Sequence, residues 1–189
     1  TCQEVLDSVI IAYRVAEDPD VCLPVIVNQD GFYLSFTREP VEVPDADAVR
    51  RFIPPYNPAS GCFRADTPQS RGVIVLGGTQ YSYFRYATHL ACINAMKVYE
   101  KAASEFRELF GRYYPPVEEY RMDDADYCFI MAGAFATKGM DAVDRLRKEG
   151  IKIGLVRPRL LRPFSGEALK ASLRGLKCAA VIDQNISMG

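Results

Sequence analysis

The first residues with the types and spacing for chemistry follow a short apolar run near the start of the chain. Residues 21–27 are mostly apolar and rich in valine, and Asn28-Gln29-Asp30-Gly31 ends the run. This pattern predicts a buried parallel strand that ends in a loop, with Gly31 at positive φ. Ligands of open α/β sheets bind beyond the carboxyl ends of the strands, so Asp30, Gly31 and Phe32 form the first candidate site. A plain turn is the alternative.

Two further segments have the residue types of anion sites. Gly133 to Gly139 is expected to join a strand to a helix, whose free N–H groups could receive an anion. Its glycine spacing is not that of a phosphate loop, so an ordinary turn is favoured. Arg157, Arg159 and Arg162 cluster where a later strand should end, and they could bind a carboxylate or phosphate in bidentate fashion. A subunit contact or a solvated edge is the alternative for these arginines.

Metal and nucleophile chemistry have less support. Asp123, Asp124 and Asp126 could bind a hard cation, but three carboxylates before a strand are more typical of a solvated turn. His89 is the only histidine, and no acidic or serine partner and no Gly-x-Ser-x-Gly motif accompany it, so we expect no hydrolase triad. The widely spaced cysteines exclude the usual local iron–sulfur and zinc motifs. We therefore expect no catalytic residue and no metal ligand in this chain.

Composition narrows the class of protein. The 189 residues are 49% hydrophobic, which is ample for a core, and 23 basic against 24 acidic side chains give a net charge of −1. Without a concentration of basic residues, nucleic acid is not an expected partner. Neither a membrane span nor a signal peptide pattern is evident, and cysteines such as Cys128 have the surroundings of buried thiols in a reducing compartment, so we expect a cytoplasmic protein. The start at Thr1 suggests a piece of a longer polypeptide.

The first half of the chain should contain two helices and a long connection. Residues 1–4 fit a capping box, and the helix that follows has an apolar stripe of Val5, Val9, Tyr13 and Ala16. Residues 38–78 contain six of the twelve prolines, which predicts a crossing segment that wraps a neighbouring surface, with a short helical turn near residues 50–53. Gly77-Gly78-Thr79 should open a long helix, expected from about Tyr81 to Phe110, with two apolar stripes that a domain and another subunit would cover.

The second half is more regular. Strands are predicted at residues 127–132, 151–156 and 178–182, and helices at residues 137–149 and 165–176, the second capped by Ser165. Strands that alternate with helices through short connections form parallel sheets with right-handed crossovers. The fold class expected from this pattern is α/β.

The order of several motifs resembles a known family. The motifs are Leu23 to Ser35, Val41-Glu42-Val43-Pro44, Phe52-Ile53-Pro54-Pro55-Tyr56, Phe110-Gly111-Arg112-Tyr113 and Val156 to Phe164. Their sequence is similar to the α subunit of the 2-oxoacid:ferredoxin oxidoreductases, typified by pyruvate synthase. The resemblance runs in order over almost the whole chain, which makes it more specific than any one motif.

The resemblance implies a domain organisation. Residues 1–38 would be the C-terminal end of a thiamine diphosphate pyrimidine-binding domain. Residues 39–114 would be the proline-rich crossing segment with the long helix. Residues 115–189 would be an incomplete α/β domain, similar to the transketolase C-terminal domain, with a mostly parallel sheet.

The resemblance also implies cofactors and partners. Thiamine diphosphate with Mg would be shared and bound mostly by parts outside this chain, while [4Fe-4S] clusters and coenzyme A would belong to partner subunits. The expected partners are a β subunit with thiamine and iron–sulfur sites, a γ subunit, a ferredoxin-like δ subunit, ferredoxin and a 2-oxoacid. No complete active site is expected in this chain.

Only Asp30, Gly31 and Phe32 can be carried over from the family as site residues, in a loop near the domain junction. Many members have His after the Ser of this motif, where this chain has Phe36. The substrate implied is therefore pyruvate or a larger, aromatic 2-oxoacid such as phenylglyoxylate.

Two other classes of protein remain as alternatives. The β chain of a lipoamide-linked 2-oxoacid dehydrogenase, or a transketolase, would share the type of terminal domain. A non-catalytic assembly module would explain why the sequence lacks a full set of nucleophile, base and cofactor ligands.

Overall fold

The computed structural model describes residues 1–57, 61–70, 72, 74–76 and 78–183. Contacts within the chain divide it into two compact units. The sheet unit comprises Thr1–Val5, Asn28–Glu42 and Tyr113–Gly189, and the helical unit comprises Leu6–Val27 and Val43–Arg112.

The sheet unit is built on four strands in the order β1-β3-β2-β4. The strands are β1 (Val117–Tyr120), β2 (Tyr127–Met131), β3 (Ile153–Pro158) and β4 (Cys178–Ile182). β2 pairs in parallel with both β3 and β4, whereas β1 pairs antiparallel with β3 at one edge. The sheet is therefore mostly parallel.

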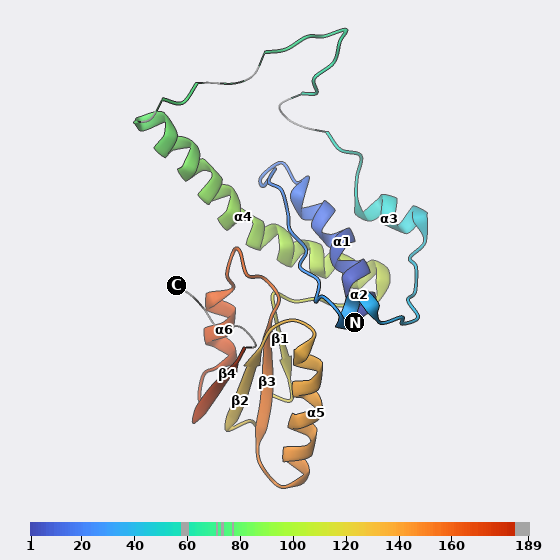
Figure 1. Ribbon diagram of the computed structural model, residues 1–189, viewed down its shortest axis with the longest axis vertical. Helices are drawn as coiled ribbons and strands as arrows, with labels where there is room; N and C mark the ends of the chain where they lie inside the picture. The colour runs from blue at the N-terminus through green and yellow to red at the C-terminus, as the bar shows by residue number, and fades with distance from the viewer. Residues whose placement is uncertain (58–60, 71, 73, 77, 184–189) are drawn as a thin grey trace. The chain divides into compact units, whose positions relative to one another are not determined.

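Two helices cover opposite faces of this sheet, α5 (Phe135–Lys148) and α6 (Gly166–Ser172) (Figure 1). Successive residues of a strand point to opposite faces. Accordingly, Leu155 of β3 packs with Val143 of α5 in one core cluster, and its neighbour Val156 packs in a second cluster that includes Leu169 of α6. The α/β fold class with a mostly parallel sheet is confirmed.

The regular pattern of the second half predicted these elements well. β4 has the predicted bounds, and β2 and α5 differ from them by one or two residues. α6 is shorter than predicted, and Ser165 occupies its N-cap position without a side-chain capping hydrogen bond. β1 has no counterpart among the predicted strands, because Glu118 and Glu119 interrupt the apolar pattern that identifies a strand.

The helical unit is packed around aromatic rings. It contains α3 (Ala46–Phe52), α4 (Thr79–Phe110) and all but the first four residues of α1 (Cys2–Ala16). The ring of Phe52 meets that of Phe106 edge-on at 5.3 Å, and the rings of Phe106 and Phe110 lie 4.4 Å apart. α4 ends, as predicted, where Gly111 takes a left-handed conformation with φ of 73°.

The predicted buried face of α1 is wrong. Val9 and Tyr13 are exposed, and the residues that α1 buries are Asp7, Ile11 and Val15. The fully buried Asp7 accepts two hydrogen bonds from Arg112, 2.6 Å from Nε and 3.1 Å from Nη2. Asp7 makes this bidentate pair in the interior, so the face of α1 that carries Asp7 is buried in place of the predicted face.

The strand predicted at residues 21–27 is also wrong. This segment pairs with no strand among the described residues, and Ile26 in it is 85% exposed. The four strands of the described chain belong to the sheet unit, so the segment has no neighbour in the helical unit with which to form a ladder. The expected positive φ is not at Gly31 but at the next residue, Phe32, with φ of 79°.

In its described residues, the proline-rich connection contains one helix, α3, which begins earlier than the predicted turn. The Asp45 carboxylate accepts a hydrogen bond of 2.9 Å from the Ala48 N–H and so caps the helix. Gly77, predicted to open the long helix, lies outside the described residues, and α4 begins at Thr79. None of the helices formed by the described residues is both long and apolar enough to cross a membrane.

Candidate site at the carboxyl edge of the sheet

The topology of the sheet unit marks one edge for ligand binding. β2 and β3 are adjacent and parallel, and the helices that follow them cover opposite faces of the sheet. In open α/β sheets such a pair of strands leaves a crevice beyond its carboxyl ends. The turn at Gly133 follows β2 at this edge, and Arg159 follows β3. Two of the predicted anion segments therefore meet here.

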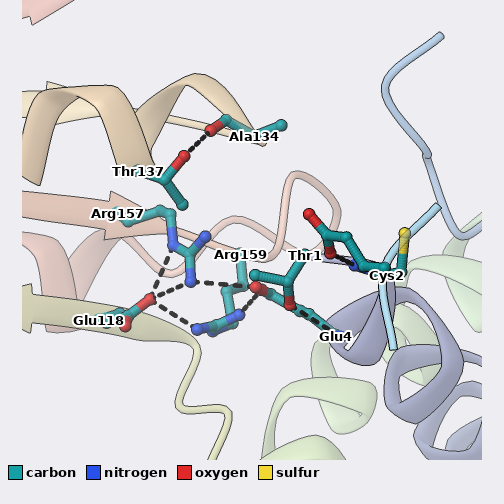
Figure 2. A network of polar contacts seen from close by, with 9 residues as sticks. Thr1, Cys2, Glu4, Glu118, Ala134, Thr137, Arg157 and Arg159 are labelled. Atoms are coloured by element: carbon teal, nitrogen blue, oxygen red, sulfur yellow. Dashed lines mark hydrogen bonds and ion pairs between the residues drawn. The ribbon is translucent and has the colours of Figure 1, made fainter. Parts of the chain in front are cut away.

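An ionic network at this edge joins Arg157 and Arg159 to Glu118 and Glu4 (Figure 2). Arg157 and Glu118 are its first pair. They lie directly opposite each other on β3 and β1, in an antiparallel pair. Arg157 Nε donates to Glu118 Oε2 at 2.7 Å, and Arg157 Nη2 donates to the same oxygen. The Arg157 side chain is buried, so this cross-strand pair is largely shielded from water.

Arg159 lies two residues further along and adds a second cation. Its Nη2 donates to Glu118 Oε2 at 2.6 Å, and its guanidinium lies 5.0 Å from the centre of the Tyr114 ring. Burial lowers the pKa of Arg159 to about 10. Its buried Nε meets no hydrogen-bond acceptor among the described residues.

Glu4, in the first turn of α1, completes the network. Its Oε2 accepts from Arg157 Nη2 at 3.2 Å, and its Oε1 accepts from Arg159 Nη1 (Figure 2). The predicted capping box is half formed, because the Glu4 N–H donates to Thr1 Oγ1 at 3.2 Å while the Glu4 side chain binds the arginines. Two carboxylates thus neutralise two guanidinium groups within the chain.

The segment that includes the Asp30 loop is tied to the same turn of α1. The Cys2 N–H donates to Glu39 Oε2 at 2.8 Å, and this hydrogen bond lowers the pKa of Glu39. The Gln3 amide exchanges two hydrogen bonds with the backbone of Glu42, of 2.6 and 3.1 Å. These contacts hold residues 37–42 beside the start of α1.

The loop of Asp30, Gly31 and Phe32 leads into the one-turn helix α2 (Tyr33–Phe36). The Tyr33 ring meets the ring of Phe135, the first residue of α5, edge-on at 5.3 Å. The loop is therefore anchored beside the turn that follows β2.

Phe32 combines strain with exposure. A positive φ is uncommon for a bulky residue, and here the Phe32 N–H donates to Ser35 Oγ at 2.8 Å. The rings of Phe32 and Phe36 lie 5.3 Å apart and are 73% and 77% exposed. The loop holds these two apolar rings in water.

The segment from Gly133 to Gly139 behaves as a turn. Gly133 has φ of 69°, and its carbonyl accepts from the Ala136 N–H. The Ala134 carbonyl accepts from the Thr137 N–H at 3.2 Å and from Thr137 Oγ1 at 2.7 Å. Two N–H groups at the start of α5 are thus used within the turn, which supports the plain-turn interpretation over an anion site.

Two other candidate residues take no part in this network. Arg162 is exposed and donates to the Leu161 carbonyl. His89 lies on the exposed first half of α4, with its ring 6.5 Å from that of Tyr86.

The three aspartates before β2 do not converge on one point. Asp124 pairs with Arg147 at 2.7 Å, which lowers the Asp124 pKa, and Asp126 pairs with Lys177 at 3.0 Å. Within the described part of the chain, no three His, Cys, Asp or Glu residues group as metal ligands.

Sequence reasoning missed three acidic residues that the structure makes important. Glu4 was assigned only to a cap, and Glu118 could not be paired with Arg157 before the antiparallel register was known. A signal for Asp7 was present in the sequence, because Asp7 shares one helix face with Ile11 and Val15. A carboxylate that is buried on such a face almost always has a partner, so a paired Asp7 could have been predicted. Its partner, Arg112, lies in the motif Phe110-Gly111-Arg112-Tyr113 that contributes to the family resemblance.

The residues at this edge can position segments but do not form a thiamine diphosphate site by themselves. A diphosphate with its cation needs free N–H or guanidinium donors and carboxylate ligands. Here the carboxylates of Glu4 and Glu118 already occupy Arg157 and Arg159, and the first turn of α5 uses its own N–H groups. The cofactor implied by the family resemblance therefore does not fit the residues at this edge alone.

Two family models match successive parts of the chain. Residues 1–105 match the family model described as pyruvate flavodoxin/ferredoxin oxidoreductase, thiamine diphosphate-binding. Residues 125–189 match the model described as pyruvate:ferredoxin oxidoreductase core domain II.

Several curated proteins are similar to almost the whole of this chain. The pyruvate synthase subunit PorA of Pyrococcus abyssi is 40% identical over 99% of this chain and 47% of its own length. The corresponding subunit of Thermotoga maritima is 38% identical over 100% of this chain and 48% of its own length. The α subunit of an NADH-dependent phenylglyoxylate dehydrogenase from Aromatoleum evansii is 35% identical over 97% of this chain and 46% of its own length.

The chain thus spans about half the length of the curated relatives that it matches. The first family model alone covers more than half of the 189 residues, and the second follows it in order. The chain therefore belongs to the pyruvate flavodoxin/ferredoxin oxidoreductase family.

Proposed function

We propose that this chain is part of a subunit of a thiamine diphosphate-dependent 2-oxoacid oxidoreductase, which decarboxylates a 2-oxoacid oxidatively to an acyl-coenzyme A and passes the electrons to a ferredoxin-type acceptor. The observation that carries the proposal is the ordered match of residues 1–105 and 125–189 to two models of one oxidoreductase family. The relatives named as pyruvate synthase and phenylglyoxylate dehydrogenase subunits support a 2-oxoacid as the substrate.

The three-part domain organisation is part of this proposal. Residues 1–38 would be the end of a pyrimidine-binding domain. Residues 39–114 would be the proline-rich crossing segment with the long helix, and residues 115–189 would form the transketolase C-terminal-like domain. The four-stranded, mostly parallel sheet supports the last assignment. The ionic network of Glu4, Glu118, Arg157 and Arg159 would then fix the first turn of α1 against the terminal domain.

The contribution of this chain would be mainly to position segments of the complex. Its described carboxylates and guanidinium groups at the sheet edge neutralise one another, so the cofactor and the electron-transfer clusters would be held by other parts of the complex. The partners proposed are the thiamine- and iron–sulfur-containing β subunit, the γ subunit, a ferredoxin-like δ subunit and ferredoxin. A cytoplasmic location would suit such a complex.

The loop of Asp30, Gly31 and Phe32 is the proposed point at which this chain approaches the cofactor. The strained φ of Phe32 and the anchor between Tyr33 and Phe135 support a rigid loop with a specific task. Substituting Asp30→Asn or Phe32→Ala in the complex should raise the concentration of thiamine diphosphate needed for half-maximal activity. A matched change at exposed Arg38→Gln should leave that concentration unchanged.

The function is tested by assembling the full-length subunit with its partner subunits and assaying reduction of a low-potential acceptor. Pyruvate and phenylglyoxylate are supplied separately, with and without thiamine diphosphate and coenzyme A. We expect turnover that depends on a 2-oxoacid, on thiamine diphosphate and on coenzyme A. The absence of thiamine-dependent turnover with every 2-oxoacid would contradict the proposal, and turnover with lipoamide in place of ferredoxin would indicate the dehydrogenase alternative.

The second candidate function is a non-catalytic assembly module. It is favoured by the neutralised ionic network, in which Arg157 and Arg159 bind carboxylates of the chain itself. Binding of thiamine diphosphate by the isolated chain, measured by calorimetry, would contradict this alternative and also the view that the cofactor site lies mostly elsewhere.

A further inference from the structure

The first half of α4 is exposed on all its sides. Every residue from Gln80 to Leu90 is exposed, and Tyr83 and Tyr86 are 67% and 60% exposed. The buried residues of α4 lie in its second half, at Ala102, Ala103 and Phe106. A helical segment of this length is only marginally stable in water without tertiary contacts.

The exposed apolar side chains form two stripes. At 100° per residue, Tyr83, Tyr86, Leu90 and Ile93 fall on one side of the helix. Tyr81 and Phe84 fall on the other side, and all six side chains are exposed. Large aromatic side chains bury about 150–250 Å² each when they are covered. The two stripes together make an apolar surface of the size that marks interaction sites.

The charge of this segment indicates the chemistry of its partner. From Thr79 to Met96 the only Lys, Arg, Asp or Glu is Arg85. A helix face that remains in water normally carries many charges, so this composition favours burial. The four aromatic residues at positions 81–86 include three tyrosines, whose hydroxyl groups need hydrogen-bond partners when they are covered.

We propose that residues 80–93 of α4 insert into an apolar socket of a partner subunit, which contacts both stripes, supplies a carboxylate to Arg85 and offers acceptors to the tyrosine hydroxyls. This inference rests on the proposed function, because a multi-subunit oxidoreductase provides the partner. Relatives of this chain are themselves named as subunits.

A second copy of this chain fits the segment less well. Two α4 helices packed side by side would each cover one stripe and leave the other in water. The segment contains no acidic residue, so a copy of it would bring no carboxylate to Arg85. A socket that surrounds the helix meets both requirements.

Hydrogen exchange measured by mass spectrometry tests the socket directly. The full-length subunit is compared alone at high dilution, alone at high concentration, and in the complex with its partner subunits. We expect fast exchange at residues 80–93 in the subunit alone at both concentrations, and exchange at least tenfold slower in the complex. Protection in the dilute subunit would mean that another part of the same polypeptide covers the helix. Protection that grows with its concentration would mean a second copy. Either result, or no protection in the complex, overturns the proposal.

Substitutions on each stripe test whether both are covered. Tyr83→Glu and Phe84→Glu each place a charge on one of the two stripes, and Lys97→Glu is a control at an exposed position further along α4. We expect each of the first two variants to weaken assembly by at least tenfold in Kd, and the control to change it less than twofold. An effect from only one stripe would overturn the socket. Circular dichroism of each variant subunit establishes that it remains folded.

The outcomes separate this inference from the proposed function. A complex with thiamine-dependent 2-oxoacid turnover but an unprotected α4 would overturn the socket alone. A complex that protects α4 but shows no such turnover would overturn the proposed function, while the socket would stand for that assembly.

Discussion

The two units stabilise buried charge in different ways. In the helical unit, Asp7 accepts a bidentate pair of hydrogen bonds from Arg112, and the carboxylate of Asp7 is fully buried. In the sheet unit, Glu4 and Glu118 share two arginines, and both glutamates keep part of their side chains in water. A shared network can redistribute when it loses one member, whereas the loss of Asp7 removes both of the hydrogen bonds that the buried carboxylate accepts from Arg112. Each ionic centre can therefore be broken separately, with a different expected cost.

The largest effect is expected when the Asp7–Arg112 pair is broken. Asp7→Ala removes the carboxylate that accepts from Arg112 and leaves the guanidinium without it, which costs about 3–5 kcal/mol for buried pairs. Chemical denaturation measures the loss in the free energy of unfolding, and hydrogen exchange of α1 locates it in the helical unit. Asp47→Ala is the matched control, because the Asp47–Arg50 pair is exposed and should contribute less than about 1 kcal/mol. Equal losses in the two variants would contradict the assignment.

Removing Glu118 should have the next largest effect. Glu118→Gln takes the charge from the oxygen that accepts from both Arg157 and Arg159. Hydrogen bonds to charged groups contribute about 1.5–3 kcal/mol, and Glu4 still compensates part of the positive charge. We expect a loss in this range, measured by denaturation and by faster hydrogen exchange at β1 and β3. A loss as large as that of Asp7→Ala would show that the network does not redistribute.

A smaller effect is expected at Glu4, which accepts one hydrogen bond from each arginine and lies in the first turn of α1. Glu4→Gln should cost about 1 kcal/mol and increase exchange in the first turn of α1. A double-mutant cycle with Arg159→Lys sharpens the comparison, because partners in one network should show a coupling energy of about 0.5–3 kcal/mol. Additive losses would mean that Glu4 and Arg159 act independently.

The smallest effect concerns Cys128, a buried group of the sheet unit that is uncharged at neutral pH. Burial raises the pKa of its thiol from 9.0 to about 11. Between these values the unfolded thiol ionises and the folded thiol does not, so stability should fall as pH rises from 9 to 11. Cys128→Ala should remove about 1 kcal/mol of this fall between pH 9 and 10. The control Cys178→Ala alters an exposed thiol and should leave the slope unchanged.

Segments with strong local signals were predicted from the sequence. α4 has a long helical period and a terminal glycine, and the structure places it at Thr79–Phe110. The strands around Phe129 and Ala180 are short apolar runs with clear ends, and they form β2 and β4. The strand expected at residues 21–27 had the same kind of signal but failed, because an apolar run becomes a strand only where other strands can pair with it.

The candidate site was predicted only in part. Arg157 and Arg159 were expected to bind a carboxylate or phosphate, and they bind carboxylates, but those of Glu4 and Glu118. Glu4 and Arg159 are 155 residues apart in sequence, so no local pattern could join them. The role of Asp30, Gly31 and Phe32 stays a prediction, although their loop is found beside Phe135 at the expected edge of the sheet.

The sequence by itself determined the family, the α/β class and most helices and strands of the second half, because these depend on local periodicity and on motif order. Only the tertiary structure decided which carboxylate meets which guanidinium, which face of α1 is buried, and that the first half of α4 lies uncovered. Those features depend on register and on packing between segments that are distant in sequence. Shifting a strand by one residue moves its core-facing side chains to the solvent face, so local patterns do not determine them.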